Sequence, residues 1–396
     1  MAPRDLYTTP NALAPHYTRF RVSERLLLTG HSHQAWPDRG FEGQRQAWLD
    51  AAELLDEKWD RAFEKAERVR RGYRRLLGDP DGPIALAEST HDLVVRFLSA
   101  LPLRDRPRVV TTDAEFHSAR RQLDRLAEEG LEVVRVPAHP TAEAGERVAE
   151  AVDDRTAAAM VSSVFYTSGH IAGGLEAAAE ACRQTGAELL VDAYHALNVV
   201  PFSLDGLEDA WVVGGGYKYC QLGEGNCCLR VPPGREPRPV VTGWFAEFAA
   251  LEEAKDDGRV VYGEGPSRFA GSTYDPTSHY RAAEVFDHFE ELALTPSLLR
   301  EVSRHQVGLL AEGVDALDAD PALLDRDRSV PPERIGGFLA LRSPRAGELR
   351  AGLRERGVMT DHRADVLRLG PAPYLSDAQL RDAVAALADV VRELDA

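Results

Sequence analysis

Only four lysines occur among the 396 residues, and one of them, Lys218, stands where a solvated charge is not expected. It follows the apolar run 210–213 and three glycines, within the segment GGGYKYCQLGEG. An ammonium that leaves water must be paired, neutralised or used covalently, because its desolvation is costly. Lys218 is therefore the first residue from which we expect chemistry.

Asp192 offers Lys218 a chemical partner. It ends a second apolar run, ELLVD, 26 residues before the lysine, and the chain continues with Ala193, Tyr194 and His195. Pyridoxal phosphate (PLP) chemistry requires a lysine that forms a Schiff base. It also requires an acidic group that keeps the pyridine nitrogen protonated, so that the ring accepts electrons. The two strand ends together predict a PLP enzyme.

The elements that must position these residues alternate between strand and helix. Apolar runs predict six strands, at 84–87, 108–110, 131–134, 158–161, 189–191 and 211–213. Helical patterns cover a charged stretch at 41–77 and four shorter segments, at 93–101, 118–129, 145–152 and 175–185. This alternation predicts an α/β fold with a mostly parallel sheet, whose ligand lies outside the carboxyl ends of the strands.

A second, shorter α/β pattern follows a helix expected at 277–292, with strands at 337–341 and 367–369. We therefore predict three parts. Residues 1–45 form an N-terminal segment that packs on the small domain. Residues 46–290 form a large PLP-binding domain, and residues 291–396 form a small C-terminal domain.

The bulk composition narrows the class of protein. The formal net charge of −17 argues against nucleic acid or an anionic membrane as a partner. No apolar stretch resembles a secretion signal or a membrane span. The four cysteines show neither a disulfide framework nor metal-ligand spacing, so we expect a cytoplasmic protein without a metal.

Two further strand ends carry weaker signals. Thr90 and His91 stand between a strand and a helix, where hydroxyl and backbone N–H groups can hold a phosphate. The alternative is an ordinary helix cap. Phe116 also follows a strand and could stack on a cofactor ring, although an aromatic there could equally belong to the core.

Five segments in order resemble those of one family, and the likeness as a whole runs from about Leu26 to the C-terminus. They are VDAYHALNVVPFSL, GGGYKYCQLGEG, GWFAEF, SRFAGST and VMTDHRADVLRLGPAPYLS. The family is the kynureninase-like branch of the class V, fold-type I PLP enzymes. Each segment alone is a modest signal, whereas five with compatible spacing make a strong one.

The resemblance implies roles for the residues around the cofactor. Lys218 would form the Schiff base and later move the substrate Cα proton, and Asp192 would pair with the pyridinium nitrogen. Phe116 would stack on the ring. The phosphate would be held by five side chains: Thr90, His91, His195, Tyr217 and Trp244.

The resemblance also implies a homodimer with shared active sites, because Gly271 and Ser272 would reach the phosphate of the neighbouring subunit. On the substrate side, Arg368 would hold the α-carboxylate in a two-pronged contact, which a guanidinium is shaped to make. The alternative for Arg368 is a structural ion pair. Tyr166 would contact the same substrate.

The substrate-side segments depart from the family pattern. His117 and Ser118 replace a proline and a threonine, and Phe165 stands where an asparagine is usual. Near the start, His31 and His33 flank Ser32 in a segment that differs from the family. We expect these two histidines in the pocket, as donors to a carboxylate or as an acid for a leaving group. The alternative is a pair of histidines satisfied within their loop.

Three reactions fit these residues. The first is β-elimination from an S-substituted cysteine, which breaks the Cβ–S bond. The second is hydrolytic Cβ–Cγ cleavage as in kynureninases, and the third is transamination. Cysteine desulfuration is disfavoured because no cysteine is expected on a mobile loop near the substrate. The alternative to an enzyme is a protein with the same fold that has lost catalysis and serves as a binding or scaffold subunit.

Overall fold

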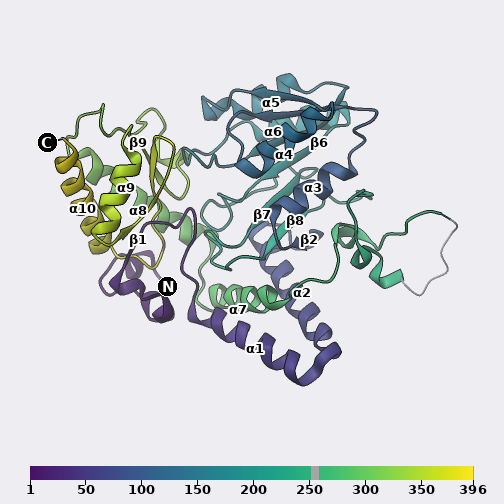
Figure 1. Cartoon of the computed structure of the whole chain (residues 1–396), viewed down its shortest axis with the longest axis horizontal. Helices are drawn as coiled ribbons and strands as arrows, with labels where there is room; N and C mark the ends of the chain where they lie inside the picture. The colour runs from purple at the N-terminus through teal and green to yellow at the C-terminus, as the bar shows by residue number, and fades with distance from the viewer. Residues whose placement is uncertain (251–257, 396) are drawn as a thin grey trace.

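The computed structural model describes residues 1–250 and 258–395, and a seven-stranded mixed sheet forms the centre of its larger part (Figure 1). The strand order is β2-β8-β7-β6-β5-β3-β4. The strands are β2 (Ile84–Ala87), β3 (Arg108–Thr112), β4 (Glu132–Val136), β5 (Thr156–Ser162), β6 (Glu188–Asp192), β7 (Trp211–Gly215) and β8 (Cys227–Arg230).

Five strands of the sheet, from β7 to β4, run parallel, whereas β8 is antiparallel to both of its neighbours. The predicted α/β fold with a mostly parallel sheet is confirmed. Asp192 is the last residue of β6, and Lys218 follows β7, its neighbour in the sheet. The two residues therefore lie at the carboxyl ends of adjacent parallel strands.

Helices cover both faces of the sheet. α3 (Thr90–Ala100) and α4 (His117–Glu128) pack on one face, while α5 (Ala144–Ala151) and α6 (Leu175–Thr185) pack on the other. Successive strand residues belong to opposite cores: Leu190 joins the first core and Val191 joins the second. This period of two, with both faces buried, explains why the strands read as continuous apolar runs in the sequence.

The charged stretch predicted as one helix at 41–77 is two helices, α1 (Asp38–Leu54) and α2 (Lys58–Leu77). The chain turns at Leu55, whose φ is +49°. Both helices pack on α7 (Thr277–Glu291), and Figure 1 shows them together below the sheet. The approach is close at Gly43, where a Cβ would come within 2.5 Å of the Tyr280 carbonyl oxygen.

The smaller C-terminal part contains a three-stranded antiparallel sheet in the order β11-β12-β9. Its strands are β9 (Leu339–Arg342), β11 (Asp361–Arg363) and β12 (Val366–Leu369), and its helices are α8 (Pro296–Asp315), α9 (Ala346–Glu355) and α10 (Asp377–Asp395).

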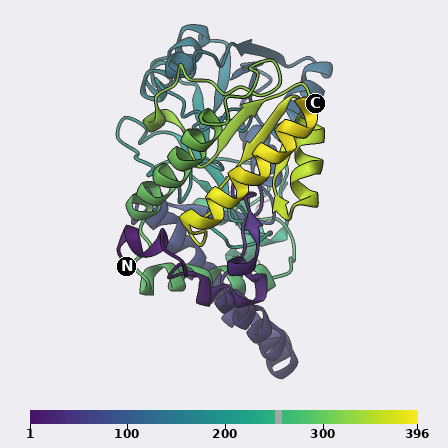
Figure 2. The same cartoon turned by 90° about the vertical axis from the view of Figure 1, so that its left-hand side faces the viewer.

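The N-terminal segment packs on this small domain. Strand β1 (Leu26–Leu27) of the segment pairs in parallel with β10 (Val358–Met359) of the small domain. Asn11, also in the segment, donates to the carbonyl oxygen of Pro373. Figure 2 shows this segment, in purple, beside the yellow α10. The domain limits remain predictions, and the limit placed at residue 45 falls inside α1.

No helix in the described ranges combines the length and the apolar content that a bilayer crossing requires. Within those same ranges, no group of three or more His, Cys, Asp or Glu side chains is arranged to hold a metal ion.

Candidate functional site

A cavity of about 290 Å³ opens at the carboxyl ends of β6 and β7, at the low end of the size range of ligand sites. It brings together most of the residues predicted to contact the cofactor. They are Thr90, His91, Phe116, Asp192, His195, Tyr217 and Lys218.

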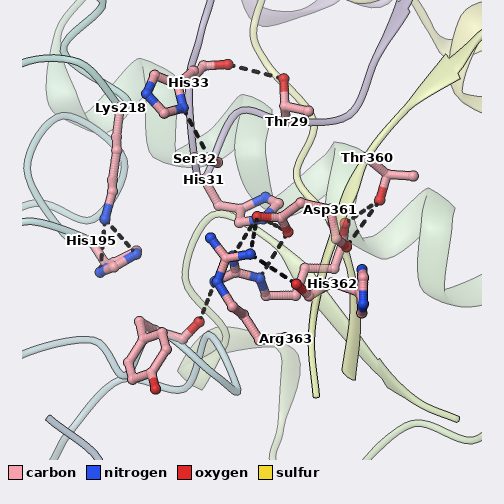
Figure 3. Close-up of polar contacts among 12 residues, drawn as sticks. Thr29, His31, Ser32, His33, His195, Lys218, Thr360, Asp361, His362 and Arg363 are labelled. Carbon is pink, nitrogen blue, oxygen red and sulfur yellow. Dashed lines mark hydrogen bonds and ion pairs between the residues drawn. The ribbon is translucent and has the colours of Figure 1, made fainter. Parts of the chain in front are cut away.

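Lys218 supplies a buried amine to this cavity, with only 4% of the residue exposed. Its Nζ lies 2.7 Å from Nε2 of His195 (Figure 3). It lies 5.2 Å from the ring centre of Phe116. Burial lowers the pKa of Lys218 to about 7, against the opposing charge of Asp192, and Arg368 lowers it further. The amine can therefore lose its proton near neutral pH.

Asp192 supplies an acidic group to the cavity, as Lys218 supplies a basic one. Its Oδ1 accepts a hydrogen bond from the Tyr194 N–H at 2.8 Å. Burial raises the pKa of Asp192, and this hydrogen bond and the charge of Lys218 oppose the rise. A positively charged ring nitrogen placed against this carboxylate would favour its ionised form.

Glu115 is a second buried carboxyl near Asp192, and the sequence analysis missed it. It accepts hydrogen bonds from Thr112 Oγ1 at 2.6 Å, from the Ser162 N–H at 3.1 Å and from the Ser162 Oγ at 2.5 Å. Burial raises its pKa to about 7, with Asp192 adding to the rise. The carboxyl group ties the end of β3 to the end of β5, directly before Phe116.

The amino terminus of α3 faces the cavity with Thr90 and His91. Ser89 caps this helix by accepting a hydrogen bond from the Asp92 N–H. The first N–H groups of a helix have no partners within the helix and carry a partial positive charge. This end of the cavity is therefore suited to an anion such as a phosphate.

Trp244 and Ser272, both predicted to contact phosphate, lie outside this cavity. Trp244 is 43% exposed and contacts Phe245, with 4.4 Å between ring centres. Ser272 lines a neighbouring cavity of about 510 Å³ that shares Glu88 and Gly225 with the first. Within one chain, the predicted contact of Trp244 with the phosphate site is absent, because its short 3₁₀ helix packs on aromatic side chains instead.

Arg368, on β12, faces Asp361 across the register of β11 and β12. Its Nε and Nη2 donate to the two carboxylate oxygens of Asp361 at 2.9 and 2.5 Å, and its Nη1 donates to the carbonyl oxygen of Tyr166 at 2.7 Å. A guanidinium has five N–H donors. Two remain, one on each terminal nitrogen, so Arg368 can still take a substrate carboxylate.

His31 lies behind this arginine. Its side chain is fully buried, and its Nε2 lies 2.7 Å from Asp361 Oδ1 (Figure 3). Burial lowers the pKa of His31 to about 4, although Asp361 opposes the shift, so the neutral ring donates Nε2–H to the carboxylate. The structure thus makes His31 a positioning partner of Asp361. The sequence had predicted His31 in the pocket, but His31 does not line the cavity.

His33 lies at the rim of the cofactor cavity. Its ring stacks on Tyr217, with centres 4.7 Å apart and planes 16° from parallel. Its Nε2 lies 3.6 Å from Glu224, another residue of the cavity wall. His33 is exposed, so it covers Tyr217 from the solvent side.

Tyr166 and His117 form a pair on the large-domain side of Arg368. The Tyr166 hydroxyl lies 3.5 Å from Nε2 of His117, and the ring of Tyr166 meets that of Phe116 edge-on at 5.3 Å. The sequence analysis gave no role to His117 or Asp361. Reading residues 361–363 as a strand would have placed Asp361 and Arg363 on one face of it, and this pattern was the signal that could have pointed to Asp361 as a site residue.

These residues fit pyridoxal phosphate. The molecule has an aldehyde, a basic ring nitrogen and a phosphate, and the cavity offers an amine with a lowered pKa, a strand-end carboxylate and a helix amino terminus. Phe116, at the N-cap of α4, supplies an aromatic face beside the amine.

Comparison with known proteins agrees with this fit. Residues 299–387 match the kynureninase C-terminal domain family. A kynureninase of Burkholderia pseudomallei (strain 1106a) is 26% identical over 414 residues, which cover 96% of this chain and 92% of that protein. An uncharacterized aminotransferase of Bacillus subtilis (strain 168) is 23% identical over 342 residues, which cover 86% and 87%.

Solved structures show the same fold at lower identity. The cystine C–S lyase C-DES, in complex with its reaction product cysteine persulfide, aligns with a TM-score of 0.80 at 15% identity, covering 93% of this chain and 98% of that one. A cysteine desulfurase from Thermococcus onnurineus NA1 aligns with a TM-score of 0.77 at 17% identity, covering 93% and 95%. Across the matched regions the chain is thus similar to kynureninases in sequence, and it shares its fold with solved structures of the C–S lyase and cysteine desulfurase type.

Proposed function

We propose that the chain is a PLP-dependent lyase that breaks the Cβ–S bond of an S-substituted cysteine. In the net reaction, R–S–CH₂–CH(NH₃⁺)–COO⁻ and water give R–SH, pyruvate and NH₄⁺. The observation that carries the proposal is the pairing of Lys218, a buried amine, with Arg368, whose two remaining donors fit a carboxylate. The two groups suit the Cα–H and the carboxylate of one amino acid.

When bound, PLP supplies a protonated ring that draws electrons away from the substrate Cα. The protein must then remove the Cα proton, and Lys218 is the base that we assign to this step. An amine with a pKa of about 7 is neutral often enough at neutral pH to accept that proton. His195 holds the amine in place from 2.7 Å.

Arg368 orients the substrate. Asp361 fixes the guanidinium plane from one side, and His31 in turn holds Asp361. The two remaining donors bind the α-carboxylate and so determine which Cα bond faces Lys218. Positioning of this kind accounts for a large part of many enzymatic rate enhancements.

Tyr166 and His117 are the groups that we assign to the leaving sulfur. A thiolate that departs from Cβ needs a proton, and the Tyr166 hydroxyl can donate one with His117 beside it. Neither group is required to activate water against a carbonyl. This is the reason for ranking elimination above hydrolysis.

All four cysteines are buried, with at most 3% of any of them exposed. Burial also raises the pKa of each thiol: Cys182, Cys220, Cys227 and Cys228. A desulfurase needs a reactive, accessible thiolate to receive sulfur from its substrate. These cysteines therefore favour a lyase over a desulfurase.

A second candidate is hydrolytic Cβ–Cγ cleavage of a kynurenine-like substrate. The match of residues 299–387 to the kynureninase C-terminal domain family favours it. Transamination, suggested by the uncharacterized aminotransferase relative, is the third candidate.

We also propose that the enzyme is a homodimer in which Trp244 and Ser272 serve the partner's phosphate site. Both residues lie outside their own cofactor cavity. The same segment carries Val240 and Val241, which are 82% and 44% exposed. Apolar side chains gathered on a surface are typical of an interface between proteins.

The test supplies the holoenzyme with an S-alkylcysteine, with kynurenine, and with an amino acid plus a 2-oxo acid. We expect equal amounts of thiol and pyruvate from the S-alkylcysteine. Release of anthranilate from kynurenine at a higher rate would overturn the ranking in favour of hydrolysis. Lys218→Ala is the control, and we expect it to abolish product formation from every substrate.

A further inference from the structure

Strand β11 presents two charged side chains to the substrate side of the site. Side chains alternate along a strand, so Asp361 and Arg363 share one face and His362 takes the other. His362 points towards α9, where a Cβ on Gly347 would lie 3.6 Å from its Nε2. Arg363 therefore stands on the same face as Asp361, the residue that holds Arg368.

Arg363 differs from Arg368 in how much of its binding capacity is used. Its Nη1 donates to the carbonyl oxygen of His362 and forms a long ion pair, 3.6 Å from Asp361 Oδ2; among residues 1–250 and 258–395 Arg363 has no other ion pair. Its side chain is 44% exposed, whereas that of Arg368 is 4% exposed. Most of the Arg363 donors are thus free to meet a ligand that enters from solvent.

His117 and Tyr166 face the same space from the large domain. His117 is exposed, and its ring lies 5.1 Å from that of Tyr166, whose carbonyl oxygen is bound to Arg368. Burial, together with the charges of Arg120, Arg363 and Arg368, lowers the pKa of His117. The ring is therefore a neutral hydrogen-bond donor beside a cation.

This local charge runs against the charge of the whole chain, which is −17. The carboxylate on this face, Asp361, is already engaged by Arg368 and His31. Arg120, whose charge also lowers the pKa of His117, is paired with Asp124. A free cation at the mouth of a site in an acidic protein favours anionic ligands over neutral ones.

We propose that Arg363 and His117 bind an anionic group at the far end of the substrate, beyond the sulfur. The substrate class is then an S-substituted cysteine whose thiol portion carries a carboxylate or a sulfonate. The proposal depends on the proposed function for the position of the sulfur. The preference for negative charge can be measured whether or not the Cβ–S bond breaks.

The experiment compares two ligands of nearly the same shape, S-carboxymethylcysteine and S-carbamoylmethylcysteine, which differ by one negative charge. The readout is the ligand concentration that half-saturates the change in visible absorbance of the bound cofactor on rapid mixing. In the native holoenzyme we expect the carboxylate ligand to saturate at about tenfold lower concentration, a difference of about 1.4 kcal/mol.

In Arg363→Gln we expect this preference to fall to about twofold or less, because the amide cannot form a charge-assisted contact. Arg363→Lys keeps the charge and should keep most of the preference, so it serves if the glutamine variant folds poorly. Arg354→Gln, on the exposed surface of α9, is the matched control and should retain the full preference. Equal saturation by both ligands in the native enzyme, or a preference that survives in Arg363→Gln, overturns the proposal.

Product analysis separates this proposal from the proposed function. A preference for the carboxylate ligand without any thiol or pyruvate would support the anion site and overturn the elimination. Thiol and pyruvate at equal efficiency from both ligands would do the reverse.

Discussion

Burial has opposite effects on the two best-defined titratable groups of the site. It lowers the pKa of Lys218 to about 7 and raises the pKa of Glu115 to about 7, because each group loses the hydration of its charged form. Perturbed pKa values of this kind gather at functional sites. Each shift also makes the stability of the apo-protein depend on pH.

For Lys218 the folded pKa lies below the ordinary value of 10.5. Between about pH 7 and pH 10 the unfolded chain binds a proton that the folded chain has lost, so stability rises with pH. We expect the apo-protein to gain stability relative to Lys218→Met over this range, by up to about 1.4 kcal/mol per pH unit. Urea unfolding at a series of pH values measures it, and parallel profiles for the two proteins would contradict it.

For Glu115 the folded pKa lies above the ordinary value of 4.5. Between about pH 4.5 and pH 7 the folded chain holds a proton that the unfolded chain has released, so stability falls as pH rises. Glu115→Gln keeps the shape without the titration. We expect the native apo-protein to lose stability relative to this variant across that window, and a constant difference between the two would refute the assignment.

At the scale of elements, the phosphate contact that we expect at the amino terminus of α3 would link helix capping to cofactor retention. Removing a serine cap costs about 1 kcal/mol of stability and loosens the first helical turn. We expect Ser89→Ala to lose about this much and to release the cofactor faster on dialysis. Thr295→Ala removes the equivalent cap of α8. It should cost similar stability and leave cofactor release unchanged; if both variants release it equally fast, α3 has no special role.

The pairing of β11 with β12 supports a second prediction, about Asp361. Asn in its place keeps the shape but leaves the buried Arg368 without its anion, and breaking such a pair costs about 3 kcal/mol. We expect Asp361→Asn to lower the unfolding free energy by this amount and to raise KM more than it lowers kcat. The control is Asp315→Asn, whose partners Arg326 and Arg328 are more exposed, with an expected loss of about 1 kcal/mol or less.

Sequence reasoning located elements well where periodicity alone decides them. The helix predicted at 175–185 is α6 to the residue, and the strand predicted at 84–87 is β2. The break at Leu55 escaped prediction, since neither glycine nor proline marks it, and the packing of both helices on α7 cannot be read from local sequence. Local patterns carry no information on such tertiary causes.

The site shows the same division. Lys218 and Asp192 could be predicted because each ends a buried strand, and neighbouring strand ends meet in a parallel sheet. His31 was misplaced because its partner, Asp361, lies 330 residues away in the chain. Glu115 was overlooked because a glutamate before a helix is ordinarily solvated, and nothing local indicates that β3 and β5 bury it.

At the scale of the whole molecule, the proposed dimer assigns Trp244 and Ser272 to a partner. We expect the native enzyme to sediment as a dimer. Val241→Asp, which places a charge among exposed apolar side chains, should shift it towards monomer and weaken cofactor retention. Ala351→Asp, on the exposed surface of α9, should do neither. A monomeric native enzyme that holds its cofactor firmly would refute the shared site.

The bond from Arg368 to the Tyr166 carbonyl oxygen ties together two parts of the chain 202 residues apart. The guanidinium that we propose binds the substrate carboxylate therefore also joins the smaller C-terminal part of the chain to the larger part. A substrate analogue without its α-carboxylate, such as an S-substituted cysteamine, would lose the charge contact with this arginine. Because one guanidinium would hold both the α-carboxylate and the Tyr166 carbonyl oxygen, recognition of the substrate depends on the same residue as the contact between these two parts of the chain.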